Sequence, residues 1–232
     1  MIILAFDTCF NACSVGLRRR VGERAVDVAR FELMEKGHSE RIVPMIGEVL
    51  GEAGITVQDV DAFAVTTGPG SFTGVRTGIA VARALALATG KRVRGTSSLH
   101  VMAAGLQPMV NGGPIAIAIS TRDGLVYFQT FDGAATAPQI EPRVLSPQAA
   151  VAMMGPVEHM IGGTGADLVM AAAASIGISH RHVAGRVDAD AAVLARMAIN
   201  LAVLTPPQPL YLRDADAKPQ SGVLIQRLEA GV

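Results

Sequence analysis

The stretch from residue 66 to residue 98 limits the fold of this 232-residue chain more than any other. An apolar run at 62–65 predicts a buried strand, and the glycines between Gly68 and Gly74 then interrupt regular structure. A helix is expected from Val75 to Thr89 and is closed by Gly90. Strand, glycine loop and helix form an anion-binding geometry, but no Gly-Lys-Ser/Thr follows, so the loop is not a P-loop. A lone loop of this kind marks a tight turn more often than a phosphate site.

The helix expected at 75–89 is apolar on almost every side. Only Arg76 and Arg83 interrupt it, and they lie on nearly the same face, separated by small residues that let another backbone approach. A helix of this kind is buried on two sides. It belongs either to the core of the chain or to an interface between subunits, and the sequence favours neither.

Composition excludes several classes of function. The chain is 50% hydrophobic and 17% charged, which is typical of a folded protein rather than a disordered one. Its 20 basic and 20 acidic residues give no overall field that would attract nucleic acid, so a partner is expected to supply any basic surface for RNA. No apolar run is long enough to span a membrane, and a cytoplasmic protein is expected. Cys9 and Cys13 are expected to be reduced and free of metal.

The first hundred residues predict three strands, a helix, a strand and a helix. The strands are expected at 2–6, 13–17 and 26–31. A turn at 11–12 and a basic, turn-like stretch at 18–23 would join them into an antiparallel meander. The first helix is expected to start at its N-cap, Ser39, and to carry an apolar stripe as far as Leu50.

The same order of elements is then repeated. Strands are expected at 115–119, 125–131, 140–145 and 159–161, a glycine loop at 162–165, and helices from 146, at 166–174 and at 189–204. Each unit alone would leave one sheet face bare, so the two should pack across a cleft that the glycine loops and Asp7-Thr8 face. The expected boundaries are 1–106 for the first unit, 107–210 for the second and 211–232 for a tail.

A duplicated βββαβα unit, similar to ribonuclease H, is the plan of the α/β superfamily of actin, sugar kinases and Hsp70, called ASKHA. Five separate motifs narrow the resemblance, because together they are similar to the TsaB, or YeaZ, family. They are Ile-Leu-Ala-Phe-Asp-Thr at 3–8, Gly-His-Ser-Glu-Arg-Ile-Val-Pro-Met-Ile at 37–46, Thr-Gly-Pro-Gly-Ser-Phe-Thr-Gly-Val-Arg at 67–76, Gly-Thr-Ser-Ser-Leu at 95–99 and Tyr-Leu-Arg-Asp-Ala-Asp-Ala-Lys-Pro at 211–219. Between about Met102 and Leu204 only the pattern of elements matches.

The resemblance implies a noncatalytic scaffold that pairs with TsaD for the threonylcarbamoylation of adenosine 37 in tRNAs reading codons that begin with A. TsaE would join the assembly, tRNA would bind only within it, and the chain alone would be a homodimer. The interface residues that the resemblance implies lie on the two helices of the first unit. They are His38, Glu40, Arg41, Met45, Arg76, Ile79, Ala80 and Arg83.

No metal is expected. The related TsaD family holds a metal through Gly-Val-Asn-His-x-x-x-His, and this segment aligns with residues 95–102, which places Ser98 and Met102 at the ligand positions. A hydroxyl and a thioether do not replace two imidazoles for a borderline divalent ion. His100 lies nearby without a second histidine at helical spacing, and such a histidine is more often structural.

The resemblance also implies a vestigial nucleotide cleft, formed by Asp7, Thr8, Gly68, Gly70, Gly163 and Gly165. Phe10 is bulky where backbone should approach an anion, and Cys9 and Thr121 depart from the family pattern. The expectation is therefore no cofactor, apart from a weakly held or interfacial adenine nucleotide. Two alternatives stay open: a small-molecule kinase or ATPase that uses Asp7 to organise a metal, and a metallopeptidase-like hydrolase.

Overall fold

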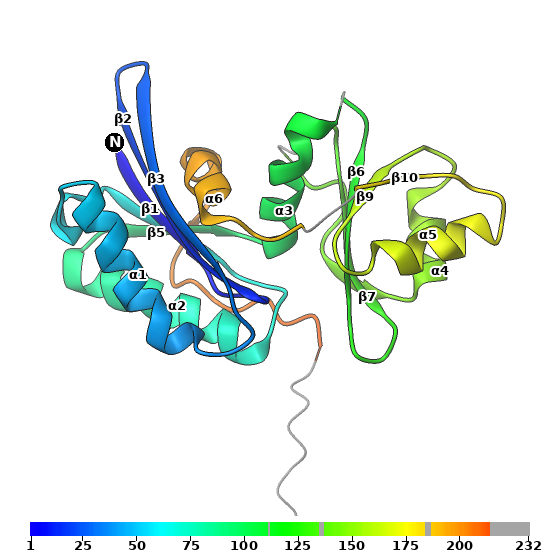
Figure 1. Ribbon diagram of the computed structural model, residues 1–232, viewed down its shortest axis with the longest axis horizontal. Coiled ribbons are helices and arrows are strands. Elements are labelled where there is room, and N and C mark those ends of the chain that lie inside the picture. Colours follow the sequence, from blue (N-terminus) through cyan, green and yellow to red (C-terminus); the bar gives the residue numbers. More distant parts are fainter. Residues whose placement is uncertain (111, 135–136, 184–186, 214–232) are drawn as a thin grey trace, which may run out of the picture.

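The computed structural model describes residues 1–110, 112–134, 137–183 and 187–213. The chain forms two α/β units, each built on one β-sheet with helices packed against it (Figure 1). The expected tail, 211–232, lies outside the described residues except for its first three positions. No helix in the described part is both long and apolar enough to cross a membrane.

Strands and helices alternate in the order that the sequence predicts. The first unit has β1 (Ile2–Asp7), β2 (Ala12–Val21), β3 (Arg24–Leu33), α1 (His38–Glu52), β4 (Ala62–Thr66), α2 (Phe72–Thr89), β5 (Arg92–Thr96) and α3 (Ser98–Leu106). The second has β6 (Ile115–Ser120), β7 (Val126–Phe131), β8 (Arg143–Leu145), α4 (Pro147–Met154), β9 (Met160–Gly162), α5 (Ala166–Ala174) and β10 (Arg181–His182). The chain continues into α6 (Ala191–Met197) and β11 (Val203–Leu204), and 3-10 turns span Val57–Asp59, Gln107–Met109 and Ala198–Asn200.

The two sheets share one topology. Their strand orders are β11-β5-β4-β1-β2-β3 and β10-β9-β6-β7-β8. In each, the first three strands form an antiparallel meander, and the next strand pairs in parallel with the first. The predicted duplication of a βββαβα unit is therefore confirmed.

Helices cover the first sheet on both faces. On one face, α1 and α2 bury a cluster that contains the side chains of Phe6, Phe63 and Ile42. On the other face, α3 and α6 bury Ile3 and Ala5 together with Ile115 and Phe131 of the second unit. The two units therefore share one core, which lies around α3 and α6 (Figure 1).

The predicted boundary of the second unit, 107–210, differs from the structure. α6 packs on β1 and β2, and β11 pairs with β5, so both elements belong to the first sheet. The start of α6 lies so close to β2 that a Cβ at Gly16 would be 2.6 Å from the backbone carbonyl carbon of Ala191. Only glycine at this position of β2 lets the start of α6 lie on the strand.

Several element ends also differ from the prediction. α2 begins at Phe72, because the Ser71 hydroxyl accepts a hydrogen bond from the Gly74 amide at 3.1 Å, while the predicted end at Gly90 is confirmed. α1 is preceded by Gly37, with φ at 89°, and not by Ser39. The basic stretch expected to turn at 18–23 continues β2 as far as Val21. α6 has seven residues and ends well before the predicted residue 204.

Candidate functional site

The outer face of α1 and α2 is a surface of small and apolar side chains. The two helices lie side by side on the same face of the first sheet (Figure 1). Besides the exposed charged residues Glu40, Glu48, Glu52, Arg76 and Arg83, the two helices expose a set of small or apolar residues. They are Val43, Gly47 and Gly51 of α1 and Ala80, Ala84 and Leu87 of α2, all exposed, with Leu87 89% accessible. Small residues let a second backbone approach closely, so this surface suits packing against another helix.

Two of the predicted interface residues are wrong. Met45 is fully buried and Ile79 is 3% exposed. Met45 points into the core between α1 and the sheet, and Ile79 packs with Cys9 and Val75 beneath the glycine loop. Both lie on the inward stripe of their helix, whereas Ala80, one residue after Ile79, points outward.

His38 and Arg41 stabilise the start of α1. The His38 Nε2 atom lies 2.9 Å from the Phe10 carbonyl oxygen, which ties the helix to the turn after β1. Arg41 forms ion pairs with Glu32 of β3 and with Glu48 two turns further along α1. Their hydrogen bonds raise the pKa of the arginine and lower the pKa of both carboxyl groups. Glu40 is exposed beside them.

Arg76 and Arg83 are exposed but already engaged by this chain. The Arg76 Nε atom donates to the Tyr211 hydroxyl at 2.6 Å, and its guanidinium lies 3.7 Å from the centre of the Phe72 ring. The Arg83 Nε atom donates to the Pro207 carbonyl oxygen at 2.9 Å. Both arginines therefore hold the segment after β11 along one side of α2. The sequence did not predict this role, although Tyr211 is the first residue of the motif at 211–219.

Asp7 ends β1 inside the protein. Its side chain is 2% exposed, and both carboxylate oxygens are occupied. One accepts a hydrogen bond from the Thr66 hydroxyl and the other accepts from the Cys9 amide at 3.3 Å. Burial raises the pKa of Asp7 to about 6, and the hydrogen bonds from Thr66 and Cys9 oppose this shift only in part. The carboxylate faces its own backbone and not an open cleft.

The structure brings Asp7, Thr8, Gly68 and Gly70 together, as the sequence predicts, but packs them against one another. The Ser71 amide donates to the Cys9 carbonyl oxygen at 2.7 Å, and the Thr8 hydroxyl donates to the Gly74 carbonyl oxygen at 2.7 Å. A Cβ at Gly70 would lie 2.4 Å from the Cys9 carbonyl oxygen. Glycine at residue 70 therefore lets the loop lie against the turn after β1.

The second glycine loop packs in the same way against its own unit. A Cβ at Gly163 would lie 2.4 Å from the Ala118 carbonyl oxygen, and one at Gly165 would lie 2.9 Å from the Ser120 amide nitrogen. These glycines allow the loop to lie on β6. A nucleotide held between the two loops stays a prediction.

The positions aligned with metal ligands are part of the core. Ser98 is fully buried and its hydroxyl donates to the Pro69 carbonyl oxygen, while Met102 is 1% exposed. The His100 Nδ1 atom lies 2.8 Å from the Thr96 hydroxyl, and its ring stacks on Phe131 at 5.4 Å. Each of these side chains therefore has a structural contact that explains it.

Both cysteines are buried and unpaired by disulfides. Burial raises the pKa of the Cys9 thiol well above its usual value and raises that of Cys13 to about 12, with the nearby Asp7 carboxylate adding to each shift. Because the thiolate is the reactive form, these thiols are inert at neutral pH. They contribute to packing.

Comparison with known proteins places this geometry in a family. The family model for TsaD, described as tRNA N6-adenosine threonylcarbamoyltransferase, matches residues 32–161, more than half of the chain. The chain is 40% identical to the tRNA threonylcarbamoyladenosine biosynthesis protein TsaB of Escherichia coli over 131 residues, 56% of this chain and 55% of that protein. YeaZ from Pseudomonas aeruginosa superposes with a TM-score of 0.77 at 28% identity, covering 91% of this chain and 99% of that one. The chain belongs to the TsaB/YeaZ family.

The residues that match the TsaD family model, 32–161, include both helices of the outer face. The chain spans about half the length of the curated TsaB relatives it matches. An uncharacterized protein of Mycobacterium tuberculosis (strain H37Rv) is 33% identical over 94% of each chain. The superposition on YeaZ covers 91% of this chain, so the match in fold extends into the second unit.

Proposed function

We propose that this chain is the noncatalytic subunit that pairs with a TsaD-type protein to make N6-threonylcarbamoyladenosine at position 37 of tRNAs reading codons that begin with A. The chain would hold its partner in the working shape in the cytoplasm, and the transfer reaction would take place on the partner. The observation that carries this proposal is the outer face of α1 and α2. Its exposed small and apolar side chains lie within residues 32–161, which the TsaD family model matches.

The buried state of Asp7 supports a scaffold over a kinase or an ATPase. A carboxylate that organises a metal must present an oxygen to it, and both oxygens of Asp7 accept hydrogen bonds from the chain itself. We expect the purified chain to show no ATP turnover above background and no stoichiometric iron or zinc. A weak adenine nucleotide at the interface with the partner is compatible with the proposal, and so is TsaE as a third subunit that joins only when the pair has formed.

Ala80 offers a sharp test of the interface, because it points outward from the middle of the outer face. Replacing Ala80 with tryptophan should abolish co-elution with the TsaD-type partner, since the bulky ring prevents close approach of the second helix. The melting temperature should stay within about 2 °C of the wild type, because an exposed substitution changes stability by less than ~0.5 kcal/mol. Size-exclusion chromatography of the mixture and a thermal melt measure the two effects.

Ala171 of α5 provides the matched control, because it is an exposed helical alanine in the other unit. Ala171→Trp should leave co-elution intact. The same pair of variants tests the homodimer that we propose for the isolated chain, because Ala80→Trp alone should convert it to a monomer in light scattering. Retained pairing by a well-folded Ala80→Trp variant would refute the outer face as the interface.

A further inference from the structure

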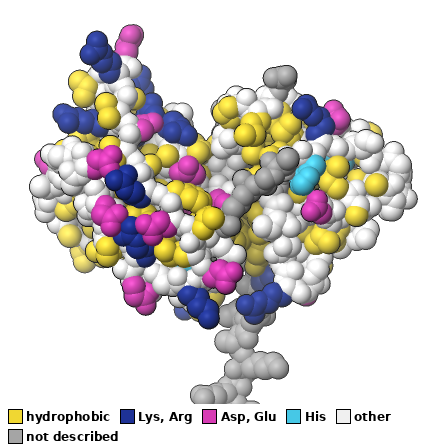
Figure 2. Space-filling model, in the orientation of Figure 1, with side chains coloured by type: hydrophobic (Ala, Val, Ile, Leu, Met, Phe, Trp, Pro, Cys, Tyr) yellow, Lys and Arg dark blue, Asp and Glu magenta, His cyan; other side chains and the backbone are white. Residues whose placement is uncertain are grey.

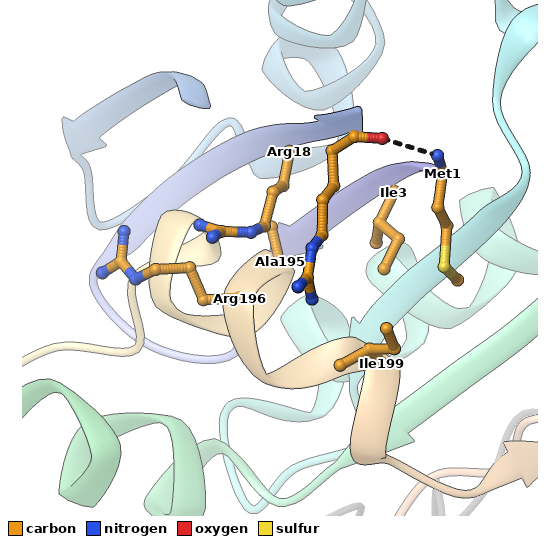
Figure 3. A pocket seen from close by; sticks show the side chains of 7 residues that line it. Met1, Ile3, Arg18, Ala195, Arg196 and Ile199 are labelled. Atoms are coloured by element: carbon orange, nitrogen blue, oxygen red, sulfur yellow. Dashed lines mark hydrogen bonds between the residues drawn. The ribbon is translucent and has the colours of Figure 1, made fainter. Parts of the chain in front are cut away.

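A pocket with three arginines lies on the other side of the first sheet from the outer face. Arg18 and Arg20 reach it from β2, and Arg196 reaches it from α6 (Figure 3). Its floor is apolar and consists of Ile3, Ala195 and Ile199. The cavity measures about 90 Å³, which is far below the roughly 300 Å³ of a site for a drug-sized ligand, so it has room only for a small group. We call it the arginine pocket.

The positive charge of the arginine pocket is only partly neutralised. Arg18 forms an ion pair with Asp27 at 2.9 Å, and Arg196 approaches the same carboxylate at 3.6 Å. Arg20 donates to the Gly22 carbonyl oxygen at 3.1 Å, and the described residues give it no acidic partner. The pocket thus holds three guanidinium groups, and only the Asp27 carboxylate pairs with any of them among the described residues. Over residues 18–30, the two strands and their turn carry five arginines and two acidic residues. Figure 2 shows basic side chains gathered on this hairpin, although the chain as a whole has no net charge.

A larger groove lies next to the arginine pocket on α6. It runs between α3 and α6, measures about 370 Å³, and shares Arg196 with the pocket. Its walls mix polar with apolar side chains, and the apolar ones include Ala104, Val193 and Met197. Gln107 and Asn200 line it from opposite sides, are exposed, and have no side-chain hydrogen bond among the described residues. We call it the α3–α6 groove.

The two cavities together match the parts of one nucleotide. Guanidinium groups bind phosphate through several donors at once, and the arginine pocket offers three of them around a space for a small anion. An unpaired base needs an apolar slot with hydrogen-bonding groups at its edge, which the α3–α6 groove provides through its two side-chain amides. The remaining arginines of the hairpin extend the positive surface beyond what a single free nucleotide requires, and this favours a polymer.

We propose that this chain binds single-stranded RNA, with a backbone phosphate in the arginine pocket and the adjoining base in the α3–α6 groove. The choice of RNA rests on the proposed function in tRNA modification. The site lies across the sheet from the outer face of α1 and α2, so the two surfaces act independently. This reverses the expectation from net charge that only a partner supplies the basic surface.

The test uses the full-length chain alone and a fluorescently labelled single-stranded RNA, with anisotropy measured between 50 and 200 mM salt. Arg20→Gln with Arg196→Gln should weaken binding at least tenfold and reduce the salt slope by about 0.7, since the pocket holds one phosphate and each phosphate of a single strand contributes roughly 0.7. The control is Arg92→Gln with Arg122→Gln, which removes the same charge at exposed positions elsewhere and should change affinity less than twofold. An equal loss in both double variants would reduce the effect to net charge and overturn the site.

The groove is tested separately with Gln107→Ala and Asn200→Ala in one chain. This variant should lose about tenfold in affinity with an unchanged salt slope, because it removes base contacts and no charge. Double-stranded RNA of the same length should bind at least tenfold more weakly than the single strand. Two results would overturn the assignment to single-stranded RNA. One is equal binding of the duplex, and the other is displacement of the RNA by AMP with a Kd for AMP that is lower than the Kd for the RNA. An absence of RNA binding by the wild-type chain would overturn it as well.

Failure of this site and failure of the proposed function give different results. Ala80→Trp should lose the TsaD-type partner and keep RNA binding, whereas Arg20→Gln with Arg196→Gln should lose RNA and keep the partner. If wild-type pairing fails while RNA binding responds to the arginines, the proposed function is wrong and the site stands. If pairing succeeds and RNA binding ignores the arginines, the site is wrong and the proposed function stands.

Discussion

Replacing Gly74 with alanine is expected to destabilise the protein by at least ~3 kcal/mol, at the upper end of what overpacking costs. A Cβ at this position in the first turn of α2 would lie 2.0 Å from the Thr8 carbonyl oxygen. That oxygen belongs to the main chain, and the Thr8 hydroxyl also bonds to the Gly74 carbonyl oxygen, so neither segment can move alone. Because whole domains are stable by roughly 5–15 kcal/mol, the variant should unfold at a much lower urea concentration.

The control is Gly47→Ala in α1, where a Cβ would meet nothing within 4 Å. This change should raise the free energy of unfolding by about 0.5–1 kcal/mol, because alanine loses less backbone entropy than glycine in a helix. The two substitutions add the same methyl group to a helix and should act in opposite directions. A Gly74→Ala variant with a wild-type urea midpoint and slope would contradict the close packing of α2 on the end of β1.

The sequence predicted the order of strands and helices because short-range sequence patterns determine that order. Short apolar runs, the glycine loop and Gly90 each act over a few residues, and their repetition revealed the duplicated unit. For α6, such patterns predicted the helix but not its position in the fold. Its cap and apolar residues predicted a helix, but the sheet it covers depends on the close approach at Gly16 of β2, about 175 residues earlier in the chain.

The outer face of α1 and α2 shows a second limit. α2 is apolar on nearly all sides, so periodicity alone could not separate the stripe that faces the sheet from the stripe that faces solvent. Ile79 and Ala80 were both assigned to the interface, but Ile79 is buried and Ala80 is exposed. The net charge of the chain was misleading for a related reason, because it averages over all residues. It therefore hides a basic hairpin on which Arg18 and Arg20, two residues apart in a strand, lie on the same face.

Buried titratable groups in the two units are expected to change the free energy of unfolding in opposite directions as the pH falls. His159 and His180 lie in the second unit, 5% and 7% exposed, with ring centres 5.8 Å apart. The His159 amide donates to the Nδ1 atom of His180 at 3.3 Å, and the His180 Nε2 atom is buried without a partner in the described structure. Burial lowers the pKa of both histidines, and for His180 the neighbouring His159 lowers it further.

The signs follow from linkage between proton binding and folding. Asp7 has a folded pKa of about 6 against an unfolded value of 3.8, so its protonation stabilises the fold. This contribution is complete below pH 3.8 and is lost as the pH rises through 6. The histidines have folded pKa values below 6.5, so the unfolded chain takes up their protons first. Their contribution is complete above pH 6.5 and is lost as the pH falls through the folded pKa values.

Asp7→Asn separates the two effects. The raised pKa corresponds to about 3 kcal/mol between pH 4 and pH 7.5, at roughly 1.36 kcal/mol per pKa unit, and the variant should lose this dependence. Its free energy of unfolding should exceed that of the wild type at pH 7.5, where the wild-type protein holds a buried carboxylate charge, because the Thr66 hydroxyl can turn to keep a hydrogen bond to the amide. Below pH 6.5 only the histidine term remains, so the variant should become steadily less stable on acidification.

His180→Asn is the matched change of opposite sign, because its amide oxygen can still accept from the His159 amide while the imidazole is removed. This variant should gain stability relative to the wild type at pH 5 and should differ least from it above pH 7. Urea unfolding from pH 4 to pH 8 on the wild type, both variants and their combination measures these terms, which should add because the two sites share no contact. A wild-type profile that Asp7→Asn leaves unchanged would mean that Asp7 is ionised in the folded protein at pH 5, and that its two internal hydrogen bonds outweigh the cost of burying it.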